Sequence, residues 1–255
     1  MLQIAERPAA AVNVSRMDER IIDLLDRVTY KRAVDGEDME QVYKLRYDAY
    51  RRVRLIDGNA VDFEGGKYSD SHDGTPNCFV FGVYLDGSMV GTIRLHVADR
   101  HRRWMPSAGF VPHLINRWLD EGLVLVDATR FAHVDGLGGA GRLLPYATIR
   151  LTALAGVHFD ADYNVQLLQS HHASFYAKAT ASELIEVRQA SFAGEPFEMS
   201  VMRADFPYMR KRCAAERAYF LSSRREREQL FGGRHQGFVA PSVREIVDGQ
   251  EDSGY

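Results

Sequence analysis

One segment of the chain combines a strand-like sequence with two opposite charges. Asp127 and Arg130 interrupt a run of aliphatic and β-branched residues over 123–134. A carboxylate or guanidinium in a buried strand is costly unless it is paired or used in chemistry. The sequence therefore predicts one of two things: a salt bridge between these side chains that only fixes the sheet, or an active site.

A glycine-rich loop, residues 135–142, follows this strand directly. Its glycines allow main-chain N–H groups to approach an anion, and a following helix adds a positive end that favours phosphate. A phosphopantetheine or pyrophosphate group would suit such a loop. The alternative is a flexible loop that only reverses the direction of the chain and binds no ligand. The spacing of Gly136, Gly138 and Gly141 also fits a dinucleotide fingerprint, but no acidic residue ends the next strand, which disfavours that fold.

The histidines and cysteines predict neither a metal site nor a disulfide. His171 and His172 face different directions, and no carboxylate lies near them at ligand spacing. Cys78 and Cys213 are far apart and neither belongs to a CxxC pair, so we expect reduced thiols and no metal.

The elements that would position these residues alternate between helical and strand patterns. We predict helices over about residues 17–27, 38–51 (capped by Asp35), 112–121, 141–158 and 172–180, and strands over 29–33, 79–84, 89–97, 123–134, 163–169, 183–192 and 197–203. Asp86-Gly87 predicts a hairpin turn. Because hairpins and crossovers both occur, we expect an α/β (α+β) mixed sheet. Residues 52–77 form the longest predicted loop, a candidate functional one.

Composition indicates an ordinary globular chain. The 255 residues are 45% hydrophobic and 26% charged, with a net charge of −3, so there is no overall nucleic-acid footprint. The basic tract at 208–228 is expected to be a solvated helix face. No apolar run of about 18 residues and no signal-like start are present, so we expect no membrane span and a cytoplasmic location.

Four spaced motifs occur over about residues 30–200. They are Arg46-x-x-x-Tyr50, Asp70-Ser-His-Asp73, Val90-Gly-Thr-Ile-Arg94 and Asp127-Ala-Thr-Arg130-Phe131. In this order the chain resembles the acyl-homoserine-lactone synthases and, more closely, a sister group, the N-acyl amino acid synthases. It departs from the lactone synthases in three ways: Asp127 stands where they have Glu, Tyr50 where they have Phe, and no Trp occurs between Arg51 and Gly58.

The resemblance implies a GNAT-like acyl-CoA N-acyltransferase fold, a three-layer α/β/α sandwich. This domain would span 28–208, after an N-terminal extension with a short helix (1–27) and before a basic helix and flexible C-terminal tail (209–255). The implied activity moves a fatty acyl group from acyl carrier protein to the α-amine of an amino acid, often an aromatic one such as tyrosine. The alternatives are a lactone synthase using S-adenosylmethionine, a GNAT acetyltransferase using acetyl-CoA, and a catalytically silent acyl-carrier-binding or sensory domain.

The resemblance also implies roles for particular residues. The catalytic set would be Asp127, Arg130, Arg46, Arg94, Asp70 and Asp73. Asp127 would accept the amine proton directly or through water, and Arg46, Arg94, Asp70 and Asp73 would order the 52–77 loop. The donor thioester would contact Phe131, Ala132, His133, Gly138, Gly139, Gly141 and Arg142, and the acyl chain would lie near Leu144, Phe175 and Tyr176. No tightly bound cofactor is expected, since the acyl-phosphopantetheine thioester is a co-substrate.

The expected partner is an acidic acyl carrier protein. It would dock on basic residues of the C-terminal tract and of one loop before the Asp127 strand. These residues are Arg210, Lys211, Arg212 and Arg217, with Arg100, Arg102 and Arg103.

Overall fold

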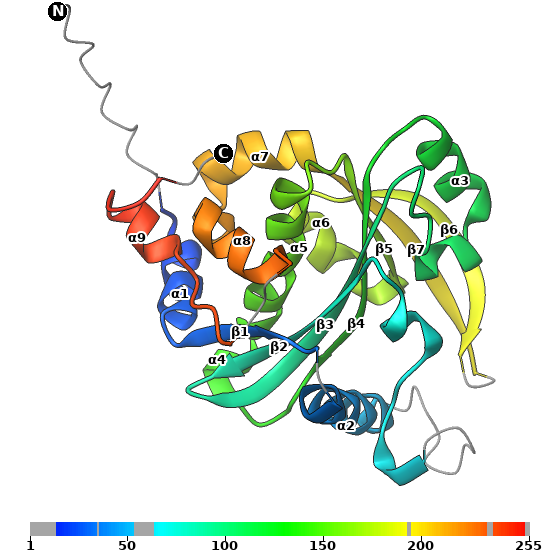
Figure 1. The fold of residues 1–255 in the computed structure, drawn as a ribbon, viewed down its shortest axis with the longest axis horizontal. Coiled ribbons are helices and arrows are strands. Elements are labelled where there is room, and N and C mark those ends of the chain that lie inside the picture. The colour runs from blue at the N-terminus through cyan, green and yellow to red at the C-terminus, as the bar shows by residue number, and fades with distance from the viewer. Residues whose placement is uncertain (1–13, 35, 54–63, 193–194, 234–236, 253–255) are drawn as a thin grey trace, which may run out of the picture.

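The structure is a computed structural model that describes residues 14–34, 36–53, 64–192, 195–233 and 237–252. Within these ranges seven strands form one sheet in the order β1-β2-β3-β4-β5-β7-β6 (Figure 1). The strands are β1 (Val28–Arg32), β2 (Cys78–Leu85), β3 (Ser88–Ala98), β4 (Leu125–His133), β5 (Tyr163–Gln169), β6 (Glu183–Phe192) and β7 (Glu195–Asp205). Neighbouring strands are antiparallel except β4 and β5, which confirms the expected mixed sheet.

Helices cover both faces of this sheet (Figure 1). On one face α5 (Leu144–His158) lies against β3, β4 and β5, and α1 (Arg16–Leu25) packs on α5. On the other face α2 (Gly36–Arg52) contacts β2, β3 and β4, while the 3-10 turn η3 (Pro106–Gly109) joins α3 (Pro112–Asp120) to β4 and β5. The sheet is therefore the middle of three layers, as predicted. The predicted cap of α2, Asp35, lies outside the described residues.

The hairpin between β2 and β3 forms at the predicted turn. Asp86 and Gly87 have φ values of +49° and +82°. A two-residue turn with both central φ values positive matches the right-handed twist of the flanking strands. Leu85 then pairs with Ser88, which places the buried residues of β3 on the core side.

The parallel pair β4–β5 is joined for only part of its length. Leu125, Val126 and Asp127 pair with Tyr163, Asn164 and Val165. Beyond Asp127, β4 runs on to His133 with β3 alone as its partner, and β5 runs on to Gln169 paired with β7. The two central strands therefore diverge at the middle of the sheet. We call this opening the β4/β5 gap.

The C-terminal segments cover the α5 face. They comprise α7 (Phe206–Glu216), the turn η5 (Ala218–Phe220), α8 (Arg224–Phe231) and α9 (Val243–Val247). Residues 218–223 are all buried, and helix α7 ends before them. The expectation of one solvated helix over 208–228 is therefore wrong, because the apolar residues within this tract pack into the main core. Residues before 28, such as Ile21, belong to the same core.

A fully buried ion pair attaches α8 to α5. The Arg150 guanidinium donates to both oxygens of Glu226, at 2.5 Å (Nη1 to Oε1) and 2.9 Å (Nη2 to Oε2). Its Nε also donates to the carbonyl of Tyr219 at 2.7 Å, and Ser242 donates to Glu226 through both its N–H and its hydroxyl. The pair has many partners because an isolated charge at this depth would be strongly destabilising.

Within the described ranges no helix is both long and apolar enough to cross a membrane.

We predict that Glu226→Gln lowers the free energy of unfolding by about 3–5 kcal/mol, because it leaves the Arg150 charge buried without a counter-charge. The measurement is urea denaturation of both proteins. Glu228→Gln on the same helix is the matched control: its partner Arg224 is exposed, so the change should stay within about 0.5 kcal/mol. Equal losses in the two variants would contradict this account.

Candidate active site

Strand β4 changes the direction of its side chains at Arg130. Thr129 pairs with Arg94 and Ala132 with Thr92, so two residues of β4 lie opposite Ile93 of β3. Arg130, the first residue of this bulge, has φ +55°. A non-glycine residue in the left-handed region costs about 1–2 kcal/mol and persists where its surroundings hold it. The bulge therefore places the side chains of Thr129 and Arg130 on the same face, toward α2.

Five charged side chains meet on that face and form what we call the charged network: Arg46, Asp70, Asp73, Arg94 and Arg130. Arg94 Nη1 lies 2.5 Å from Asp70 Oδ1 and 3.1 Å from Asp73 Oδ1. Arg46 donates to Asp73 at 2.9 Å, and Arg130 Nε donates to Asp70 Oδ2 at 2.9 Å. Two carboxylates are thus shared by three guanidiniums. The network joins α2 and the turn η2 (Ser71–Gly74) to the sheet.

Asp70 organises its own loop as well as the ion pairs. It caps η2 by accepting a hydrogen bond from the His72 N–H at 2.9 Å, and Asp73 accepts one from the Asp70 N–H at 3.2 Å. Burial opposes ionisation of Asp70, but the guanidiniums of Arg94 and Arg130 outweigh it and hold its pKa well below the ordinary value. Asp70 is therefore charged at any physiological pH.

Asp127 lies on the same face but outside these ion pairs. Its Oδ1 accepts the hydroxyl of Ser107 and its Oδ2 accepts the Ser107 N–H, both at 2.8 Å. The side chain is fully buried. A salt bridge between Asp127 and Arg130 is therefore wrong, because Arg130 bonds to Asp70 and Asp127 bonds to η3. Burial raises the pKa of Asp127 to about 6, against the opposing effects of the Ser107 bonds and the charge of Arg94.

His96 is the cross-strand partner of Asp127 and is fully buried. Its Nε2 lies 3.1 Å from the His72 carbonyl and 3.0 Å from the Thr75 hydroxyl. Burial, followed by the positive charge of Arg94, lowers the pKa of His96 to about 4. His96 is therefore neutral at pH 7 and ties the η2 loop to β3 without adding charge.

Two tyrosines pack together at the Arg130 end of the charged network. Tyr50 of α2 packs edge to face on Tyr68, with ring centroids 5.3 Å apart. The Arg130 guanidinium lies over the Tyr68 ring, 4.6 Å from its centroid. Burial raises the pKa of Tyr176, on α6 (Ala173–Thr180), to about 12, and the Tyr50 phenol adds to this rise.

The residues predicted to contact the thioester continue along β4. Ala132 is buried against α2, while Phe131 and His133 are half-buried, with their rings 4.5 Å apart. His133 Nε2 lies 2.9 Å from the Thr148 hydroxyl of α5, and burial, with the nearby Arg52 charge, lowers its pKa to about 4. This histidine is therefore neutral at pH 7.

The glycine loop leads into α4 (Gly138–Gly141), a single turn that ends before α5 begins at Leu144. The predicted long helix from Gly141 thus starts three residues later. Gly138 and Gly139 are exposed, as is Arg142, and Gly138 has φ +53°. The Phe175 ring on α6 lies 5.2 Å from the Tyr146 ring on α5.

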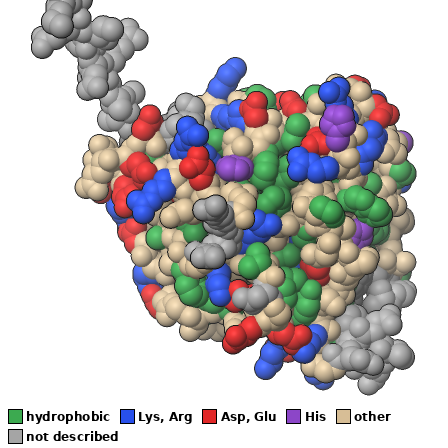
Figure 2. Space-filling model, viewed as in Figure 1, with side chains coloured by type: hydrophobic (Ala, Val, Ile, Leu, Met, Phe, Trp, Pro, Cys, Tyr) green, Lys and Arg blue, Asp and Glu red, His purple; other side chains and the backbone are tan. Residues whose placement is uncertain are grey.

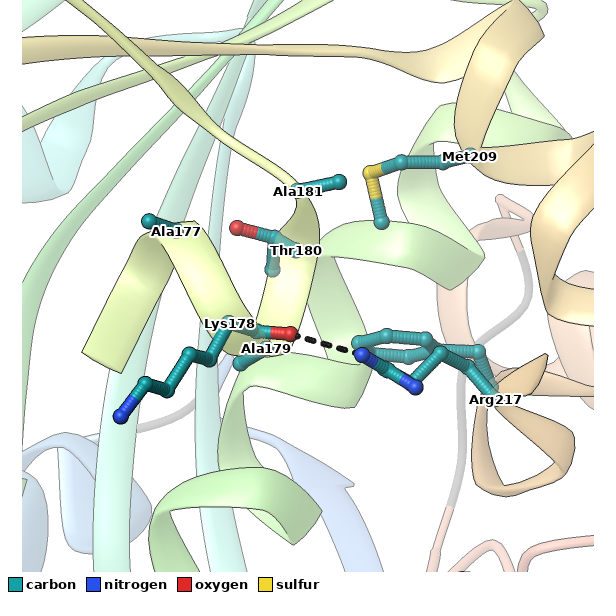
Figure 3. Close-up of a pocket in the computed structure, with 8 residues that line it drawn as sticks. Ala177, Lys178, Ala179, Thr180, Ala181, Met209 and Arg217 are labelled. Carbon is teal, nitrogen blue, oxygen red and sulfur yellow. Dashed lines mark hydrogen bonds between the residues drawn. The ribbon is translucent and has the colours of Figure 1, made fainter. Parts of the chain in front are cut away.

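Two hollows lie outside this cluster. A groove of about 410 Å³ runs between α2 and the end of β4, with Lys44, Asp48, Arg52 and His133 among its lining residues. A smaller cavity of about 110 Å³ lies between the end of α6 and α7, where Arg217 donates to the Lys178 carbonyl (Figure 3). The smaller one is lined by none of the predicted catalytic residues. No group of three metal-ligating side chains occurs in the part of the chain that the structure describes.

Sequence reasoning missed Ser107, His96 and Tyr68. Ser107 is 20 positions from Asp127, and nothing in its neighbourhood distinguishes it from an ordinary turn serine. His96 had a detectable signal, because it lies two positions after Arg94 and so on the same face of β3. Tyr68 lies just before the Asp70 motif, inside the loop already singled out as functional.

Comparison with known proteins places this site in a family. The family model for the N-acyl amino acid synthase FeeM matches residues 41–205, well over half of the chain and all of the charged network. The chain belongs to the N-acyl amino acid synthase family. It is therefore an acyltransferase enzyme, and the first part of the predicted function, N-acyl transfer, is confirmed. No protein with a curated function matches the chain.

Solved structures support the fold of this N-acyl amino acid synthase. FeeM, an N-acyl amino acid synthase from uncultured soil microbes, has 17% identity and a TM-score of 0.50, with 72% of this chain and 94% of FeeM covered. The AHL synthase LasI has 14% identity and a TM-score of 0.53, with coverages of 74% and 93%. The CoA-dependent acyl-homoserine lactone synthase BjaI has 12% identity and a TM-score of 0.50, with 74% and 90%. The predicted GNAT-like fold is confirmed.

We predict that the stability of this synthase depends on the titration of Asp127. The carboxyl binds a proton more tightly in the folded chain, where its pKa is about 6, than in the unfolded one, where it is 3.8. Its contribution to stability is therefore fully present below about pH 4 and is lost as the pH rises through 6. Asp127→Asn cannot titrate, so wild type should lose about 2–3 kcal/mol of unfolding free energy relative to it between pH 4 and pH 7.

Urea denaturation of both proteins at the two pH values measures this difference. Ser107→Ala removes a donor that favours the charged form, so it should enlarge the drop. Parallel pH dependence of wild type and Asp127→Asn would contradict the assignment.

Proposed function

We propose that the enzyme transfers a fatty acyl group from the phosphopantetheine thioester of an acyl carrier protein to the α-amine of a free amino acid. The observation that carries this proposal is the β4/β5 gap, which begins at Asp127 and has the charged network on one side. The other side is formed by apolar helices of the main core. An extended thioester fits between two such strands, with its reactive end beside the charges.

The gap suits the polar part of the phosphopantetheine arm. Among the described residues, main-chain groups of β4 that face β5 have no strand partner after Asp127, so they can pair with the amides of the arm. On β5 the side-chain amides of Asn164 and Gln166 are buried, and both Asn164 atoms and Gln166 Oε1 lack a hydrogen-bond partner among the described residues. Buried polar groups without partners are unusual unless a ligand or water satisfies them.

Residues at the far end of β4 would hold the two ends of the donor. Main-chain N–H groups between Phe131 and His133 would polarise the thioester carbonyl, a contribution on the order of 10²–10³ per donor in rate where measured. The exposed glycines of the loop, with Arg142, would bind the phosphate of the arm. The acyl chain would pass toward Leu144, Phe175 and Tyr176, which pack against the apolar core.

Asp127 is the proposed proton acceptor. An α-amine with a pKa near ~8 is mostly protonated at pH 7, so it needs a base before it can attack a thioester. With a pKa of about 6, Asp127 is mainly ionised at that pH. Because both of its oxygens bond to Ser107 and the side chain is buried, the proton would reach it through an intervening water.

The acidic carrier protein would dock on basic residues near α7 and near α3. Figure 2 shows Lys and Arg side chains in these regions, with Asp and Glu between them. Arg210 is already engaged with Asp160 and Arg217 with the Lys178 carbonyl, whereas Lys211 is exposed. Arg102 pairs with Asp99 and Arg103 with Asp120, while Arg100 is exposed. Lys211 and Arg100 are therefore the best placed to meet a carrier. The Arg212 side chain lies outside the described residues.

The decisive assay incubates the enzyme with long-chain acyl carrier protein and each amino acid in turn, then identifies acylated product by mass spectrometry. We predict transfer to at least one amino acid, with aromatic acceptors such as tyrosine favoured. Parallel reactions with S-adenosylmethionine and with acetyl-CoA test the lactone-synthase and acetyltransferase alternatives. Product only from either of those reactions, or no product at all, would overturn the proposal.

We predict that Asp127→Asn lowers kcat about 10²–10⁴-fold, since it removes the base. In wild type, kcat should rise with pH through about 6, where Asp127 ionises, and this rise should be absent in the variant. Steady-state rates measured from pH 5 to pH 8 test both points. An unchanged kcat with the same pH profile would show that the base lies elsewhere.

We predict that Lys211→Glu raises the KM for acyl carrier protein several-fold at low salt, because it opposes an acidic partner. The rate with a small acyl-pantetheine should stay unchanged. Lys67→Glu, at an exposed lysine just before Tyr68, is the control with a matched charge change. Equal loss with both donors in Lys211→Glu would refute docking at this residue.

A further inference from the structure

One border of the sheet is open. The sheet ends in β1 on one side and in β6 on the other (Figure 1). The β1 border is covered in part by a C-terminal segment, because Tyr30 and Val239 exchange both main-chain hydrogen bonds, at 2.9 and 2.8 Å. Among the described residues no strand pairs with the outer side of β6. A strand edge of this kind presents N–H and C=O groups to which another chain can bond.

Alternate residues of β6 direct their main-chain groups outward. In an antiparallel pair, residues that exchange hydrogen bonds alternate with residues that do not. Ser191 pairs with Pro196, which has no N–H to donate, so this pair is one without hydrogen bonds. The register between β6 and β7 is unbroken from here back to Glu186. Gln189 and Val187 therefore also direct their N–H and C=O groups away from β7.

The other side of β7 gives the same alternation. The Phe206 N–H donates to the Asp162 carbonyl at 2.9 Å, in line with the register of β5 and β7. Ser200, six positions earlier, therefore bonds to β5 rather than to β6. Its partner on β6 is Val187, so the main-chain groups of Val187 point to the open border.

The charges on β6 are arranged so that this strand can pair with a copy of itself. Glu186 and Arg188 flank Val187, and both side chains lie on the α3 face, where they contact His113 and the Phe110 carbonyl. A two-fold axis at Val187 would put Glu186 of each copy opposite Arg188 of the other. An axis one residue away would oppose two glutamates or two arginines. Opposite charges across an antiparallel pair attract and like charges repel, so the sequence selects one register.

The side chains along this border remain accessible. Those of Glu186 and Arg188, although they contact each other, are 26% and 41% exposed, so a second copy can reach them. Leu184, Val187 and Phe110 are 54%, 46% and 49% exposed. A partner strand would bury part of this apolar surface, which favours association beyond the main-chain hydrogen bonds.

We propose that β6 pairs with β6 of a second copy of this chain, in the antiparallel register centred on Val187. The self-complementary order of the charges favours a second copy over a strand from another protein. The symmetry is a closed two-fold, so assembly stops at the dimer, in which two seven-stranded sheets form one continuous sheet. The interface is small, so we expect a dissociation constant of about 1–100 μM. This contact does not depend on the proposed acyl transfer.

The first test measures the mass of the full chain in solution by sedimentation and light scattering, at about 1–200 μM, a range that spans the expected dissociation constant. We expect a reversible change from one chain to two as the concentration rises. A single monomeric species throughout would overturn the proposal and show that the charges of β6 protect the edge instead. Assemblies larger than two chains would also overturn it, because a two-fold contact closes.

Charge variants identify the surface. Glu186→Arg puts like charges opposite each other on both sides of the axis, so it should raise the dissociation constant about 10-fold or more. Glu186→Arg combined with Arg188→Glu restores opposite charges in the same register and should return the constant to within about 3-fold of wild type. Glu198→Arg, at an exposed position of β7, is the matched control and should leave it unchanged. Failure of the folded double variant to recover would reject this register.

Val187→Pro keeps the charges and removes only the outward N–H. Because this N–H makes no bond to β7, the variant should fold, which circular dichroism checks, and it should remain monomeric. A dimer that persists in both Val187→Pro and Glu186→Arg would show that the copies meet at another surface and reject the proposal. The oligomeric state is measured without substrate, so the result stands whether or not the proposed acyl transfer is observed.

Discussion

The structure of this site depends on two carboxylates that three arginines share. Asp70 and Asp73 lie in the segment between α2 and β2 and draw Arg46, Arg94 and Arg130 together from one helix and two strands. Removing water from so many charges is costly unless each has oppositely charged or hydrogen-bonding partners, so the arrangement is specific in geometry. It also holds Arg130 in the left-handed conformation that bends β4. The charged network and the bulge of β4 at Arg130 are therefore coupled.

The β4/β5 gap is bordered by packed residues on both faces of the sheet. On the α2 face, the charged network borders the gap. On the other face, α5 borders the gap, and the buried ion pair of Arg150 and Glu226 attaches the C-terminal segments to this helix. These segments lie outside the region matched by the family model, yet their apolar residues belong to the same core as α5. A domain boundary at 208 remains a prediction, and the packing shows that residues on both sides of it build one interior.

Much of this fold follows from local sequence patterns. The alternation at 79–84 and 89–97 with Asp86-Gly87 gives the hairpin, and the apolar spacing gives the helices. The charged residues of the site were recognisable because four motifs occurred in one order. Their partners were not, since Asp127 with Ser107, Arg130 with Asp70 and Arg150 with Glu226 are 20, 60 and 76 residues apart. A bulge at Arg130 changes which side chains share a face, and period-two reasoning along β4 cannot detect it.

The central claim is that the donor thioester lies in the β4/β5 gap. A crystal structure with a non-hydrolysable long-chain acyl-pantetheine analogue tests it most directly. We predict that the carbonyl analogue lies against the main chain between Phe131 and His133, with the arm paired to β4 and the acyl chain directed toward Phe175 and Tyr176. Binding of the analogue in the 410 Å³ groove between α2 and β4, with the gap still filled by side chains, would contradict the account.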